Sequence, residues 1–123
     1  MSRRDRVQVA NLFLAVIASH GREFFKHGDR IARFELDDRG RVWFVDAYSG
    51  RRIYTHRRVW GRGFTNGGTL MSLCQDLQRY VMGRGPLPLA RLGPWRKDLC
   101  GGDLWGYGAD MEKVRAECSV LEP

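Results

Sequence analysis

Arginines gather between Asp46 and Asp76, a stretch that no acidic residue interrupts. Planar guanidinium groups bind phosphate or carboxylate oxygens in pairs, and they stack on bases and aromatic rings. Aromatic and histidine side chains lie among these arginines, a mixture that nucleic-acid surfaces use to contact phosphates and unpaired bases. The candidate binding residues in and next to this stretch are Arg41, Arg51, Arg52, Tyr54, His56, Arg57, Arg58, Trp60 and Arg62.

The positive charge of the chain is regional. Residues 1–62 carry 14 Lys or Arg against 7 Asp or Glu, whereas residues 63–123 carry 7 of each, so the net charge of +7 belongs to the first half. Such a field suits a polyanionic partner, which is either nucleic acid (DNA or RNA) or an acidic protein surface. The structural alternative is that arginine solvates a half-exposed sheet, with Trp60 in the core.

A second candidate site is the glycine-rich approach to a predicted helix. The backbone N–H groups of Gly67, Gly68 and Thr69 could converge on an anion at the positive end of the helix dipole. The spacing matches no dinucleotide-binding motif, and no lysine precedes Thr69 as a P-loop requires. An ordinary loop and helix cap is the alternative.

The sequence contains no assembled catalytic or metal-binding motif. Its histidines, cysteines and carboxylates match no spacing of a nucleophile elbow, a metal pair or an acid and base pair. We therefore expect a non-catalytic protein that needs no cofactor or metal. A small enzyme would need a concave site joining His56 to Asp46 or Cys74, and we expect the arginines around His56 to lower its pKa by repulsion.

Length and composition predict one domain spanning residues 1–123, since 43% apolar and 28% charged residues are ordinary for a globular protein. The three cysteines are widely spaced and form no C-x-x-C pair, which favours a reducing cytoplasm. The apolar run at residues 12–18 is far shorter than the roughly 20 residues of a membrane span, so no membrane association is expected.

Periodicity predicts an α+β fold. Residues from about 30 to 57 contain three runs of alternating or β-branched residues, and the turns between them end in Gly40 and Gly50, where a left-handed residue closes a tight hairpin. We expect a three-stranded antiparallel meander packed against an N-terminal and a central helix, with its other face open.

Helical spacing of apolar residues predicts an N-terminal helix over residues 5–20, stopped by Gly21, and a central helix over 69–82, stopped by Gly83. A Gly- and Trp-rich loop should follow over residues 84–110, with a short last helix capped by Asp110. Trp105 and Tyr107 in this loop either form a contact surface or fold back to cap the core.

The order helix, three-stranded meander, helix resembles the double-stranded-RNA-binding domain, as does the stretch 61–65 before the central helix. Residues 66–69 stand where that family places its lysines. The three strands and central helix also resemble the AP2-type DNA-binding arrangement.

Three stretches, residues 40–50, 63–70 and 102–108, resemble small uncharacterised proteins of bacteriophages and prophages. That resemblance implies a bacterial cytoplasmic setting and an accessory role, either binding DNA or RNA or acting as a counter-defence inhibitor, in the manner of an anti-CRISPR protein, against a host nucleic-acid-handling complex.

Overall fold

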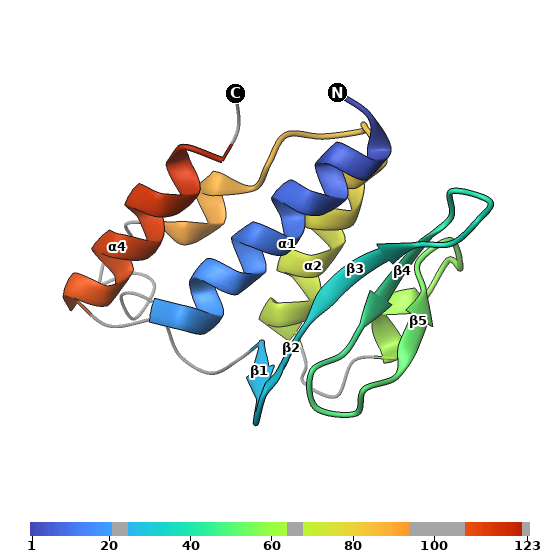
Figure 1. Ribbon diagram of the computed structural model, residues 1–123, viewed down its shortest axis with the longest axis horizontal. Helices are drawn as coiled ribbons and strands as arrows, with labels where there is room; N and C mark the ends of the chain where they lie inside the picture. Colours follow the sequence, from blue (N-terminus) through green and yellow to red (C-terminus); the bar gives the residue numbers. More distant parts are fainter. Residues whose placement is uncertain (21–24, 64–67, 94–107, 122–123) are drawn as a thin grey trace.

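The computed structural model describes residues 1–20, 25–63, 68–93 and 108–121, and these form an α+β fold, as predicted (Figure 1). Helix α1 lies between the strands on one side and helix α4 on the other. The described elements are α1 (Arg3–His20), β1 (Lys26–His27), β2 (Arg30–Ile31), β3 (Arg33–Leu36), β4 (Val42–Val45), β5 (Arg52–Tyr54), the 3-10 helix η1 (Trp60–Gly63), α2 (Gly68–Val81), the 3-10 helix η2 (Leu89–Leu92) and α4 (Gly108–Ser119).

Helix α1 begins two residues before the predicted start because Ser2 caps it. The hydroxyl oxygen of Ser2 accepts a hydrogen bond from the Asp5 N–H at 3.1 Å, and the Ser2 N–H donates to Oδ2 of Asp5 at 3.2 Å. This reciprocal pair is a capping box, which satisfies two N–H groups at the helix start. The predicted apolar stripe is buried, with Ala10, Leu14 and Ile17 fully inaccessible.

Strands β3, β4 and β5 form the predicted antiparallel meander, in that order. Gly40 and Gly50 close its two turns with φ angles of 73° and 70°, the left-handed conformation that glycine adopts at little cost. The register places Phe44 opposite Phe34 on one side and Ile53 on the other. Both turn predictions are therefore confirmed.

The meander is fastened to α1 through its edge strand β3. Asn11 donates from Nδ2 to the Phe34 carbonyl at 3.0 Å, and its Oδ1 accepts the Phe34 N–H at 2.7 Å. One amide side chain thus satisfies both backbone groups at this edge position. The Phe34 side chain meets Phe44 edge-on, 5.2 Å between ring centroids, inside the core.

Helix α2 carries the predicted apolar stripe and ends at the predicted glycine. Gly83 has φ of 75°, its N–H donates to the Tyr80 carbonyl at 3.0 Å, and the Arg84 N–H donates to the Arg79 carbonyl at 2.8 Å. These two bonds make a Schellman cap, which satisfies carbonyls that the helix leaves unpaired.

Sequence periodicity missed the short hairpin of β1 and β2, which turns at Gly28. It also predicted β2 and β3 as one strand. The two are separated at Ala32, whose N–H donates to the Phe25 carbonyl at 2.8 Å. Part of the predicted loop is helical, as η2, and α4 begins at Gly108. The predictions for Trp105 and Tyr107 lie outside the described residues.

Candidate functional site

The two faces of the meander differ sharply in burial. Along each strand the side chains alternate between faces. Phe34, Val42 and Phe44 point into the core, on the side of α1, whereas Trp43 and Tyr54 lie opposite each other on the other face and are only half-buried. We call this second face the open face. It consists of Arg33, Glu35, Trp43, Arg52 and Tyr54, together with Val45, which lies between Arg33 and Arg52 and is buried.

Aromatic rings form a row across the open face. The Trp43 and Tyr54 ring centroids lie 4.8 Å apart, and the His56 ring, just beyond β5, stacks on Tyr54 at 5.3 Å. Two guanidinium groups flank the row, with Arg52 4.4 Å from the Trp43 centroid and Arg41 5.5 Å from that of Tyr54. This arrangement of rings and cations offers stacking positions for planar groups.

Acidic residues neutralise part of this surface, which the sequence did not reveal. Glu35 binds Arg33 at 2.8 Å and Arg52 at 3.2 Å, and Asp37 binds Arg41 at 2.8 Å. Arg41 and Arg52, both predicted as phosphate contacts, are therefore already ion-paired. The pairs fix the guanidinium planes over the rings instead of leaving two free charges.

Asp37 organises the end of the open face near the β3–β4 turn. Its Oδ1 accepts the backbone N–H groups of Arg39 at 3.0 Å and Arg41 at 2.9 Å, and its Oδ2 accepts the Trp43 ring N–H at 3.0 Å. These bonds, that of Trp43 foremost, hold the pKa of Asp37 well below its usual range. The carboxylate thereby fixes both the turn and the Trp43 ring.

Four of the predicted arginines are exposed and make no ion pair among the described residues: Arg51, Arg57, Arg58 and Arg62. Three of the predicted arginines line a hollow of about 240 Å³ beside β5. The hollow is lined by Arg51, Arg52, Ile53, Tyr54, Arg57, Val59 and Trp60. Arginine side chains that line one concavity are suited to hold an anionic oxygen group.

His56 is a hydrogen-bond acceptor in this structure. Its Nε2 accepts the backbone N–H of Val42 at 2.9 Å, which requires the neutral ring with its proton on Nδ1. Burial lowers the pKa of His56, and repulsion from three arginines lowers it further. The direction agrees with the sequence-based expectation, but burial is the larger cause.

The three arginines that repel a proton on His56 are Arg3, Arg41 and Arg84, and Asp37 opposes them. Arg3 is held at the β3–β4 turn because its NH1 donates to the Gly40 carbonyl at 2.8 Å. Arg84 follows the cap of α2. The fold thus adds two arginines from distant parts of the chain to the basic region, and no local sequence signal marks them.

Trp60 does not lie on the open face. Only 8% of it is exposed, and its ring contacts Phe44 on the buried face, 6.3 Å between centroids. The ring is therefore part of the core, as the structural alternative proposed, and it cannot stack on a ligand from the open face. Its contribution to the hollow beside β5 is to form part of the wall.

The second predicted anion site is only partly described. Gly68 and Thr69 lie in the first turn of α2, and Gly67 lies outside the described residues. The anion-binding role of this helix start stays a prediction.

The candidate catalytic groups occupy separate structural positions. Cys74 is fully buried on α2, and burial raises the pKa of its thiol well above the ordinary value. Asp46 is 5% exposed and accepts the hydroxyl of Ser49 at 2.8 Å, and His20 pairs with Glu117 at 2.8 Å. Among the described residues no group of His, Cys, Asp and Glu is arranged to hold a metal ion.

No described helix combines the length and apolar character needed to cross a membrane.

Fold and site together define a small α+β protein with a half-open sheet that carries rings and guanidinium groups. The chain belongs to the YoqU family, whose model matches residues 1–120. Searches of curated proteins and of solved structures gave no match.

Proposed function

We propose that this protein binds nucleic acid without catalysis, through the open face and the unpaired arginines beside it. One observation carries the proposal: the row of Trp43, Tyr54 and His56 rings lies next to a hollow lined by Arg51 and Arg57. Rings stack on bases irrespective of sequence, while guanidinium groups hold phosphates. Binding is therefore expected to favour unpaired strands and to show little sequence preference.

The partner contacts divide into two kinds. Arg51, Arg57 and Arg58 supply phosphate contacts, because the described structure gives them no acidic partner. Arg41 and Arg52 lie over rings and are ion-paired, so they act mainly as stacking planes. Phosphate contacts release counterions, so affinity should fall steeply with salt.

We place this activity in the cytoplasm of a bacterial host, in a phage or prophage context. The resemblance to phage proteins supports this setting, as do Cys74 and Cys118, which are both free buried thiols. There are two alternative functions, a counter-defence inhibitor and a small enzyme centred on His56. The binding experiment below distinguishes both from nucleic-acid binding.

Fluorescence anisotropy of the nuclease-treated protein with single-stranded and duplex DNA and RNA, at several salt concentrations, tests the proposal. Each phosphate contact should contribute about −0.7 to the slope of log K against log salt on a single strand. Reversing Arg57 and Arg58 to Glu should therefore flatten the slope by about 1.4. Lys113→Glu serves as the control, because Lys113 is exposed on α4, across α1 from the sheet (Figure 1).

Absence of binding at low salt contradicts the proposal, as does an unchanged slope in the Arg57 and Arg58 variant. Binding of one host protein that survives nuclease treatment, with no affinity for any oligonucleotide, identifies an inhibitor instead. Turnover of a substrate that is lost in His56→Ala identifies an enzyme.

A further inference from the structure

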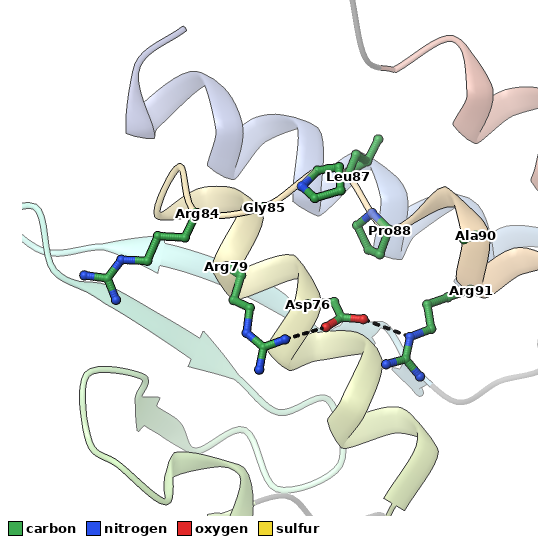
Figure 2. A pocket seen from close by; sticks show the side chains of 9 residues that line it. Asp76, Arg79, Arg84, Gly85, Leu87, Pro88, Ala90 and Arg91 are labelled. Carbon is green, nitrogen blue, oxygen red and sulfur yellow. Dashed lines mark hydrogen bonds and ion pairs between the residues drawn. The ribbon is translucent and has the colours of Figure 1, made fainter.

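A second basic surface lies where α2 ends and the chain turns into η2. A cleft of about 510 Å³ opens there (Figure 2). Its apolar part contains residues 85–88 and Ala90, of which Pro86 and Ala90 are exposed. Its charged part consists of Asp76, Arg79, Arg84 and Arg91.

One carboxylate in the cleft orients two of the three guanidinium groups. Oδ1 of Asp76 binds Arg79 at 3.1 Å and Oδ2 binds Arg91 at 2.8 Å, as the dashed lines in Figure 2 show. Among the described residues that line the cleft, three arginines stand against one aspartate, an excess of two positive charges. The Asp76 carboxylate thus lies between the guanidinium groups of Arg79 and Arg91. The excess positive charge favours binding of a second carboxylate from a partner.

The helix cap itself brings two of the arginines together. In a Schellman cap the residue just after the glycine and a residue in the last turn of the helix, whose carbonyl accepts its N–H, commonly make an apolar contact. Here these positions are Arg79 and Arg84, joined by the backbone bond of 2.8 Å. Arg84 has no acidic partner among the described residues. The negative end of the α2 dipole favours positive side chains at this position. The dipole alone provides no carboxylate partner for the two guanidinium groups, which lie beside an apolar surface.

We propose that this cleft binds an acidic segment of a partner protein, which inserts one apolar side chain against Pro86 and Ala90 while its carboxylates contact Arg79 and Arg91. Apolar contact framed by guanidinium groups is the composition of a protein interface, in which arginine is enriched. Among the described residues no aromatic ring lines the cleft, unlike the open face, so the described lining lacks the stacking positions of a nucleic-acid surface. The contacts that carry the proposal, Arg79, Arg91 and Ala90, lie outside the open face, while Arg84 of the cleft also borders the basic region at His56.

The test uses a fluorescein-labelled ten-residue peptide with one leucine flanked by aspartates and glutamates. Two matched peptides replace the leucine by serine or the acids by lysine, and a ten-nucleotide DNA strand is the competitor. Anisotropy is recorded with the whole protein, with Arg79→Glu and with Lys113→Glu, which makes the same charge change on α4. The Arg79 side chain is 64% exposed, so its reversal should leave the fold intact, as circular dichroism checks.

The acidic leucine peptide should bind the native protein, and Arg79→Glu should weaken binding about tenfold, the loss of one strong interface contact. The serine peptide should also bind more weakly, while Lys113→Glu should bind like the native protein. The proposal is overturned if the acidic leucine peptide does not bind at low salt, or if the serine or lysine peptide binds equally well. It is also overturned if Lys113→Glu weakens binding as much as Arg79→Glu. An equal loss of DNA affinity in Arg79→Glu overturns it too, because the cleft would then be an extension of the nucleic-acid surface.

Discussion

The imidazole of His56 accepts the backbone N–H of Val42 at 2.9 Å, and so completes the ladder between β4 and β5 with a side chain. Just before it, the Thr55 N–H donates to the Val42 carbonyl at 3.2 Å. In a regular antiparallel pair the Val42 N–H would donate to the backbone carbonyl of Thr55, and here the His56 ring takes the place of that carbonyl. The sheet therefore depends at this point on the protonation state of one histidine.

The first prediction is a loss of stability in mild acid. Because the pKa of His56 is lowered in the fold, the unfolded chain binds a proton more readily, from about pH 6.5 downward. The stabilisation is complete above that pH and is lost as the pH falls through the lowered value. The effect should be on the order of 0.5 kcal/mol, small because His56 is only partly buried and solvent screens its charge. Urea unfolding of the native protein and of His56→Ala between pH 7.5 and 5 measures it, and identical pH dependence in both contradicts it.

The second prediction concerns Asp37, whose carboxylate accepts bonds from Arg39, Arg41 and Trp43. Asp37→Asn removes the charge and one acceptor oxygen, so it should lower the urea midpoint clearly. Asp38→Asn is the matched control, because Asp38 is the next residue in the chain and is exposed. The native protein should also lose this contribution below the ordinary aspartate pKa, because the folded pKa is lowered and acid protonates the carboxylate. Equal midpoints for the two variants contradict the assigned role.

The meander could be predicted because its signals are local. Alternation marks each strand, and Gly40 and Gly50 mark turns that need a left-handed residue. The Ser2 to Asp5 capping box was also readable, as a serine followed three residues later by an acid, although the predicted helix began too late.

The composition of the site could not be predicted, because it depends on register and on packing. Glu35 reaches Arg52 only because β3 and β5 flank β4 in one register. Arg3 and Arg84 come near His56 only because the start of α1 and the end of α2 meet the same end of the sheet. A count of arginines along the chain therefore overstated the free charge at Arg41 and Arg52 and overlooked these two.

The third prediction separates stacking from charge on the open face. Tyr54→Leu removes the central ring of the row without changing net charge, and a stacked base is worth about 1–3 kcal/mol. Affinity for single-stranded DNA should fall about tenfold or more, with the salt slope unchanged. Tyr54→Phe keeps the ring and should bind nearly as the native protein does. Equal affinity of the Leu and Phe variants, measured by anisotropy, rules out stacking at this position.

The fourth prediction tests the cap that positions Arg84. Gly83 has φ of 75°, and a Cβ added there would lie 3.3 Å from the guanidinium of Arg6, which itself binds the Val81 carbonyl at 2.9 Å. Gly83→Ala should therefore cost at least about 1–2 kcal/mol of unfolding free energy, the usual penalty for a left-handed residue with a side chain. Gly85→Ala is the control, because its Cβ would meet only Arg79, at an ordinary 3.8 Å. Thermal unfolding of the two variants compares them directly. If both melt alike, the left-handed cap does not hold the end of α2, and another contact must fix Arg84 beside the cleft.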